Sequence, residues 1–140
     1  MASYNKFLVF TKDMIDGKHA FSTATFKVML TNSAPVNTNS IKADLTEISA
    51  GNGYTAGGTA TTITTATASG TAKVTGTDVV FTAAGGSIGP ARYAVLYNDT
   101  QTTPAKPLIA WWDYGSSITL ADTETLTVDF DATNGILTVV

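Results

Sequence analysis

Residues 85–130 of the 140-residue chain read GGSIGPARYAVLYNDTQTTPAKPLIAWWDYGSSITLADTETLTVDF. This stretch contains both tryptophans, three of the five tyrosines and the only arginine of the sequence. Residues 91–98 and 108–114 are rich in aromatic and β-branched side chains, and a polar, proline-bearing loop separates them. That pattern predicts two strands paired as a hairpin, and we expect the core of the protein here.

Both predicted strands have apolar side chains on two faces, because side chains alternate along a strand. One face of the first strand carries Tyr93, Val95 and Tyr97. The second strand divides into two predicted sets, with Leu108, Ala110, Trp112 and Tyr114 on one face and Ile109 and Trp111 on the other. Such strands are typical of the middle of a sandwich, so we expect this pair in the centre of a sheet and not at an edge.

The composition excludes several classes of protein. The chain has no cysteine and therefore neither disulfides nor thiolate metal sites. Only 14% of its residues are charged, while threonine, alanine and glycine are abundant, which predicts a neutral, hydroxyl-rich surface. The net charge is -3 and the basic residues are scattered, so we expect no nucleic-acid partner. The apolar run of residues 7–10 is too short to span a membrane, and we expect a soluble chain without a membrane partner.

The first half of the chain is predicted to contain two strands and one short helix. Residues 7–11 and 25–31 are the strands, and the polar residues 11–19 are expected to form a turn region. Alternation in the second strand predicts that only one face is buried, the face of Phe26, Val28 and Leu30.

A loop over residues 31–40 is expected to lead into that helix. Ser40 would cap it, Gly51 would end it, and one face would bury Ile41, Leu45 and Ile48.

The second half reads as further strands. Residues 51–86 are rich in threonine, alanine and glycine, with strands predicted around Ile63, Val74 and residues 79–81; a disordered linker is the alternative. Residues 125–130 and 136–140 flank an Asn-Gly pair, the strongest short signal for a hairpin. We therefore predict an all-β protein, a jelly roll or β-sandwich of about eight strands with at most one short helix. Residues 1–140 would form one domain, with residues 1–20 as an optional N-terminal arm.

The sequence predicts no catalytic, cofactor-binding or metal-binding residue. His19 is the only histidine and is expected to be exposed in a loop, because a lone histidine without cysteine does not make a usual zinc site. The carboxylate pairs Asp122 with Glu124 and Asp129 with Asp131 each fall two residues apart, as two catalytic or calcium-binding carboxylates could. We interpret them as solvated surface residues.

The adjacent tryptophans are the strongest candidates for a binding surface. Trp111 and Trp112 must face opposite ways on a strand, so one belongs to the core and the other covers a second layer, a protein partner or a sugar ring. Arginine and tyrosine carry much of the energy of protein interfaces, although Arg92 could also be a salt-bridged strand end. The predicted interface residues are Arg92, Tyr93, Trp111, Trp112 and Tyr114.

Two segments, GGSIGPARYAVLYNDT and PLIAWWDYGSSITLADTETLTVDFDATNGILTVV, resemble small virion proteins of tailed bacteriophages, above all their head decoration or cement proteins. ADLTEISAGNGYTAGG adds a weaker similarity, and residues 7–39 add little. The resemblance implies a jelly-roll protein that binds the outer surface of an icosahedral capsid and carries no catalytic residue.

From the resemblance we expect a non-enzymatic structural protein that cements neighbouring capsid subunits. Its partners would be the major capsid protein and further copies of itself, as a homodimer or, alternatively, a trimer. Its location would be the outside of the virion capsid, after synthesis in the bacterial cytoplasm. The loops of residues 31–40 and 99–107, with one tryptophan, would supply the contacts. The alternative is a tail-fibre or tail-associated β-module that binds host glycan.

Overall fold

Ten strands and one short α-helix lie within residues 2–140, the part of the chain that this computed structural model describes; the side chain of Ser3 is excepted. The strands are β1 (Ser3–Lys6), β2 (Phe26–Thr31), β3 (Thr59–Thr61), β4 (Ile63–Ala68), β5 (Thr71–Gly76), β6 (Val79–Thr82), β7 (Ile88–Asn98), β8 (Leu108–Leu120), β9 (Thr125–Val128) and β10 (Leu137–Val139). The helix is α1 (Leu8–Ile15), and η1 (Lys42–Asp44) is a single 3₁₀ turn. The protein is mostly β, as predicted.

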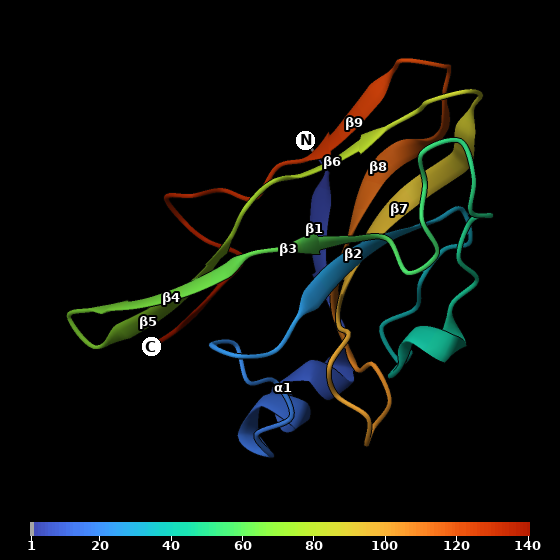
Figure 1. Cartoon of the computed structure of the whole chain (residues 1–140). Helices are drawn as coiled ribbons and strands as arrows, with labels where there is room; N and C mark the ends of the chain where they lie inside the picture. The colour runs from blue at the N-terminus through green and yellow to red at the C-terminus, as the bar shows by residue number, and fades with distance from the viewer. Residues whose placement is uncertain (1) are drawn as a thin grey trace.

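A five-stranded antiparallel sheet in the order β1-β8-β7-β2-β3 forms the centre of the molecule (Figure 1). The predicted hairpin is β7 with β8, and both strands run further than the sequence pattern indicated. Neither strand is at an edge, which confirms their predicted central place. The strand predicted at residues 25–31 is confirmed as β2. The prediction that only one of its faces is buried is wrong, because Met29 on the second face is fully buried beside Phe7 and Leu45.

Two smaller antiparallel sheets lie against this centre, in the orders β10-β5-β4 and β6-β9. Val79 and Phe81 of β6 and the side chains of Leu126 and Val128 of β9 pack on the same core as β2, β7 and β8. β4, β5 and β6 match the strands predicted around residues 63, 74 and 79–81, so the linker alternative is wrong. The β4–β5 hairpin projects from the body, and most of its residues are exposed (Figure 1).

The Asn-Gly turn does not close a hairpin. β9 pairs with β6, whereas β10 pairs with β5. Asp131 explains the difference, because its carboxylate accepts hydrogen bonds from the backbone amides of Thr133 and Asn134 at 2.7 and 2.9 Å. This local turn leads the chain from one sheet into the other, where the amide of Ile136 donates to the carbonyl of Val74.

The beginning of the chain contains a helix where a strand was predicted. The strand is β1, which pairs with β8, and the predicted strand of residues 7–11 instead opens α1. Phe10 and Met14 are four residues apart and therefore lie on the helix face that packs on the core. The first twenty residues, considered above as an optional arm, thus contribute an edge strand and a helix to the fold in their described part.

The helix predicted after Ser40 is also wrong. Only η1 forms, and the Asp44 carboxylate accepts hydrogen bonds from the amides of Ser40 and Ile41 at 2.7 and 3.1 Å. The chain then stays extended, because the amide of Ile48 donates to the carbonyl of Leu30 and so follows the end of β2. Backbone pairing with the sheet replaces the helical hydrogen bonds.

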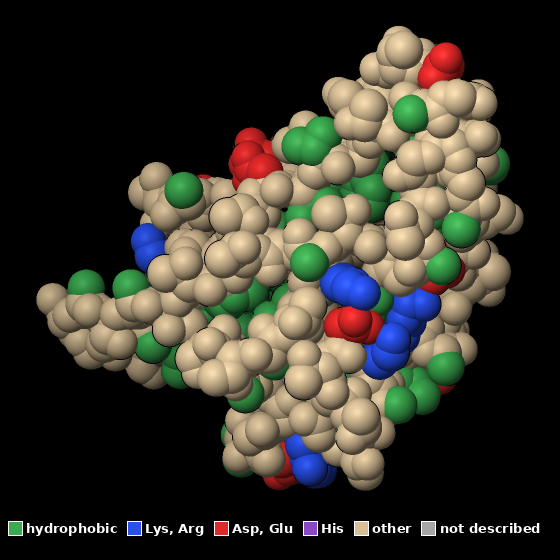
Figure 2. Space-filling view, in the orientation of Figure 1, with side chains coloured by type: hydrophobic (Ala, Val, Ile, Leu, Met, Phe, Trp, Pro, Cys, Tyr) green, Lys and Arg blue, Asp and Glu red, His purple; other side chains and the backbone are tan. Residues whose placement is uncertain are grey.

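Most of the face in Figure 2 is uncharged, and its charged side chains gather in a few small groups. This agrees with the neutral surface expected from the composition.

Candidate functional site

A β-bulge at Ile109 decides how the tryptophan region is arranged. Leu96 pairs with Ala110 and Tyr97 pairs with Leu108, so β8 has one residue more than β7 between these pairs. The extra residue shifts the alternation. Leu108 therefore lies with Trp111 in one core cluster, and Ile109 lies in the other with Ala110 and Trp112 packed against it, which corrects the predicted faces of residues 108 and 109.

Trp111 is the core tryptophan. Its side chain is 9% exposed and its ring centre lies 4.4 Å from that of Phe7. It packs with Met29 and Val95 on the sheet face that the N-terminal segment covers. Trp111 is thus the tryptophan that belongs to the core, as one of the two was expected to do.

Trp112 faces the opposite side and is half-buried. Its ring makes edge contacts with Tyr4 of β1, at 5.6 Å between ring centres, and with Phe130, at 5.3 Å. These three rings come from distant parts of the sequence. Tyr4 is 45% exposed, so this aromatic group reaches the surface.

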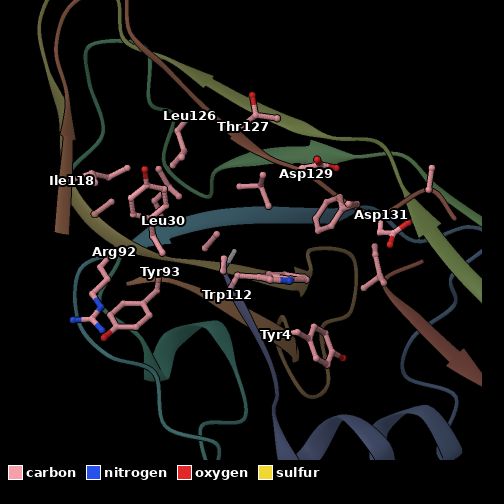
Figure 3. A pocket seen from close by; sticks show the side chains of 18 of the residues that line it. Tyr4, Leu30, Arg92, Tyr93, Trp112, Ile118, Leu126, Thr127, Asp129 and Asp131 are labelled. Carbon is pink, nitrogen blue, oxygen red and sulfur yellow. The ribbon is translucent and has the colours of Figure 1, made fainter. Parts of the chain in front are cut away.

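An open groove of about 690 Å³ lies beside Trp112 (Figure 3). The five-stranded sheet supplies one wall, and β9 with the chain that follows it supplies the other. Four of the five predicted interface residues belong to its lining, namely Arg92, Tyr93, Trp112 and Tyr114, but the ring of Tyr93 packs in the core cluster of Trp111 on the other face of the sheet. We call it the aromatic groove.

The charged groups of the aromatic groove are few. Arg92 donates from Nε and Nη2 to the two carboxylate oxygens of Asp113 at 2.8 and 2.9 Å, and its guanidinium lies 5.3 Å from the ring centre of Tyr93. Arg92 holds the pKa of Asp113 below its ordinary value. Asp129 and Asp131 remain as exposed carboxylates on the other wall, so the groove is apolar with an acidic rim.

The two loops predicted as contact surfaces lie side by side. The amide of Leu108 donates to the carbonyl of Ser40 at 3.0 Å, and the amide of Lys42 donates to the carbonyl of Lys106 at 2.9 Å. The amide of Leu8 in α1 donates to the carbonyl of Asn37 in the first loop. Leu8 is 58% exposed and Val36 is 54% exposed. We call residues 32–40 and 99–107, with Leu8, the loop surface.

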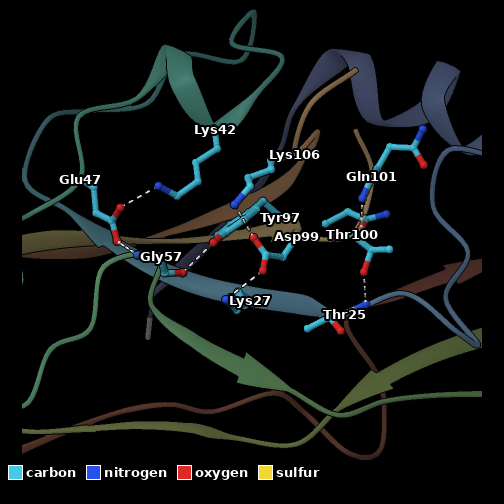
Figure 4. Close-up of polar contacts among 11 residues, drawn as sticks. Thr25, Lys27, Lys42, Glu47, Gly57, Tyr97, Asp99, Thr100, Gln101 and Lys106 are labelled. Atoms are coloured by element: carbon cyan, nitrogen blue, oxygen red, sulfur yellow. Dashed lines mark hydrogen bonds and ion pairs between the residues drawn. The ribbon is translucent and has the colours of Figure 1, made fainter. Parts of the chain in front are cut away.

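Asp99 fixes the second loop to the sheet. Its carboxylate lies 2.8 Å from the ammonium groups of Lys27 in β2 and Lys106 in the loop (Figure 4). Burial raises the pKa of Asp99, but the two lysines outweigh burial and leave the pKa below its ordinary value. Two ion pairs on one carboxylate therefore limit the freedom of this loop.

Glu47 fixes the segment that follows the first loop (Figure 4). Its carboxylate pairs with Lys42 at 2.7 Å and accepts hydrogen bonds from the Tyr54 hydroxyl at 2.7 Å and the Gly57 amide at 2.6 Å. Burial raises the pKa of Glu47, and these three donors together lower it further than burial raises it. Burial in turn raises the pKa of the Tyr54 hydroxyl.

His19 is buried and not exposed as predicted. It is 7% exposed, and its ring packs among the rings of Phe10, Phe21 and Phe26, with centres 5.2 to 6.4 Å away. Neither ring nitrogen has a hydrogen-bond partner within the described residues. Burial lowers the pKa of His19 to about 4, so the neutral ring is the form that fits this place.

All four residues of the carboxylate pairs are exposed, in agreement with their predicted surface position. Asp122 accepts a hydrogen bond from the amide of Gly85, and Glu124 accepts one from the amide of Ala121. Among residues 2–140, no group of three or more histidine or acidic side chains could hold a metal ion.

Comparison with known proteins gives no match to a protein-family model, to a curated protein or to a solved structure. No helix in the described part of the chain is long and apolar enough to cross a membrane.

Sequence reasoning missed two aromatic members of the groove, Tyr4 and Phe130. Tyr4 precedes residues 7–11, which were predicted as a strand but open the helix α1. Phe130 has the pattern of an ordinary core residue at the end of an alternating strand. Their meeting with Trp112 depends on which strands are neighbours, and only the sheet order shows this.

Proposed function

We propose that this chain is a non-enzymatic structural protein of a tailed-phage virion, which binds the outer surface of the capsid and cements neighbouring capsid subunits. The observation that carries the proposal is the loop surface, where exposed apolar side chains stand beside two braced loops. Rigid loops lose little freedom on binding, and exposed apolar side chains gain by burial against a partner. The resemblance of residues 85–140 to cement proteins supports the same conclusion.

The loop surface suits a clamp between capsid subunits. Residues 32–40 carry no charge, and the charges of Asp99 and Lys106 in the second loop are paired. Burying this surface against a partner therefore desolvates no unpaired charge. A protein that binds the assembled shell and not its free subunits stabilises the shell by mass action, and repetition over many joints adds avidity.

The test is co-sedimentation of the purified chain with mature phage heads stripped of auxiliary proteins. We expect saturable binding and greater heat resistance of the heads. Val36→Asp should weaken binding about tenfold, because it places a charge in the contact. Val80→Asp is the matched control, because Val80 in β6 is 50% exposed and lies outside the loop surface. Absence of binding by a folded wild-type chain would contradict the proposal.

A glycan-binding tail module is the second candidate. The observation that favours it is the half-exposed group of Tyr4 and Trp112 beside the exposed carboxylate of Asp129, since sugar rings stack on aromatic rings and carboxylates accept their hydroxyl hydrogens. Titration with host surface polysaccharide should then quench the fluorescence of wild type and of Trp111→Phe, but not that of Trp112→Phe. Such a result, with no binding to heads, would replace the cement proposal.

A further inference from the structure

We propose that a second copy of this chain pairs with the outer edge of β9, antiparallel to it. The β6-β9 sheets of two copies would then join across a two-fold axis at Thr127. This goes beyond the proposed function, because it concerns the chain in solution and needs no capsid.

The backbone of β9 offers unpaired hydrogen-bonding groups on its outer side. The amide of Ala83 donates to the carbonyl of Glu124, and the amide of Phe130 donates to the side chain of Asp78, both at 2.9 Å. Even-numbered residues of this stretch therefore turn their backbone groups toward β6. Because these groups alternate along a strand, those of Thr127 and Asp129 point away from β6.

This outer side is open. Within residues 2–140 β9 pairs with β6 alone, and no turn or side-chain hydrogen bond uses the backbone of Thr127 or Asp129. Both side chains are exposed, and both residues line the aromatic groove. Proteins usually protect such an edge with lysine, proline or a bulge. The sequence of β9, TLTV, has neither residue, and its register with β6 is regular.

The charges of β9 are complementary to a second copy of itself. In an antiparallel pair centred on Thr127, each Asp129 lies opposite Thr125 of the other copy. The threonine hydroxyl can donate to this carboxylate, and no two carboxylates stand opposite each other. A two-fold interface is self-complementary in this way, whereas a register centred on Asp129 would bring the two copies of this carboxylate together.

The aromatic groove explains why β9 is preferred to the outer edge of β4. Two four-residue strands bury much less than the roughly 800 Å² per partner of a standard interface. A copy paired with β9 also covers the groove beside it, with the exposed rings of Tyr4 and Tyr114 and the half-buried Trp112. The outer edge of β4 offers only small side chains after Ile63, because β4 reads ITTATA.

Cysteine cross-linking tests the pairing directly, because the chain contains no cysteine of its own. In Thr127→Cys the two new thiols meet at the two-fold axis, at a Cα distance of about 5.5 Å that suits a disulfide. We expect rapid oxidation to a covalent dimer. Thr65→Cys in β4 is the matched control, an exposed threonine on another edge strand, and should cross-link at least about tenfold more slowly at equal concentration.

A second variant guards against cross-linking by chance collision. Thr127→Pro removes only an outward amide, so pairing with β6 and the fold should remain. The dissociation constant of the dimer, measured by sedimentation equilibrium, should rise about tenfold or more. Three results would overturn the proposal: a monomeric wild-type chain at high concentration, equal cross-linking of both cysteine variants, or an unchanged dimer in folded Thr127→Pro. None of them bears on binding to heads through the loop surface.

Discussion

The two faces of the five-stranded sheet differ in what covers them. The face of Trp111 is closed by the chain itself, through Phe7 and Leu45. The face of Trp112 is covered by the smaller sheets only in part, and the aromatic groove remains open beside it. Trp111 and Trp112 are consecutive residues of the same type, but they therefore have different structural roles. The closed face holds the fold together, and the open face is where a partner gains most by burial.

Replacing Trp111 should break the closed face. Trp111→Ala removes a large side chain from a packed cluster and should lower the free energy of unfolding by about 3 to 5 kcal/mol. Urea denaturation followed by circular dichroism measures this change. Self-association of the folded fraction should stay as in the wild type, and a variant of normal stability would show that this face is not closed.

Acid should weaken the aromatic packing around His19. Its pKa is about 4 in the folded protein and about 6.5 when unfolded, so the unfolded chain binds the additional proton between these values. The contribution of neutral His19 to the free energy of unfolding is therefore fully present above pH 6.5, and up to about 3 kcal/mol of it is lost as the pH approaches 4. Denaturation of the wild type and of His19→Phe at several pH values should isolate this loss.

Asp13 is also buried beside this region, and burial raises its pKa, so it acts in the opposite direction. The contribution of Asp13 to the pH dependence is the same in the wild type and in His19→Phe, so it cancels when the two are compared. An identical pH dependence of wild type and His19→Phe would contradict the buried, neutral state of His19.

Trp112→Ala should have a smaller effect on stability and a larger one on association. Its ring is half-buried, so we expect a loss of about 1 to 2 kcal/mol in unfolding free energy. Sedimentation equilibrium should show weaker dimers, since the ring belongs to the surface that a second copy covers. Equal stability losses for the alanine variants of Trp111 and Trp112 would remove the distinction between the two faces.

Arg92→Ala should give the smallest change. Its ion pair with Asp113 is partly exposed, and exposed pairs contribute little to stability. We expect the same denaturation midpoint as the wild type at moderate salt. A clear loss of dimer without loss of stability would place Arg92 in the contact and extend the interface to that end of the groove.

Sequence patterns predicted the central hairpin because β7 and β8 combine aromatic and β-branched residues between clear loop signals. They failed where contacts between residues far apart in the sequence determine the local structure. The bulge at Ile109 changes the faces of residues 108 and 109, and periodicity alone has no sign of an inserted residue. The Asn-Gly pair is a strong hairpin signal, but Asp131 and the edge of β5 direct the chain elsewhere.

The candidate site was predicted in part for the same reason. Arg92, Tyr93, Trp112 and Tyr114 come from the two strands that the pattern identified, so pairing of these strands brings them to one part of the sheet, with Tyr93 and Trp112 in the core clusters of opposite faces. Tyr4 and the outer edge of β9 join them only through the order of strands in the sheets. His19 is a core residue because Phe10, Phe21 and Phe26 surround it, and the contacts with Phe10 and Phe26 come from other elements of the fold.

Acrylamide quenching of the two single-tryptophan variants tests the difference between the faces most directly. Trp112→Phe keeps Trp111, whose fluorescence should resist quenching at every protein concentration. Trp111→Phe keeps Trp112, which should be quenched in dilute solution and become protected as dimers form. Equal quenching of both variants, or a Trp112 signal that concentration does not change, would contradict an account in which one face is closed and a second copy covers the other.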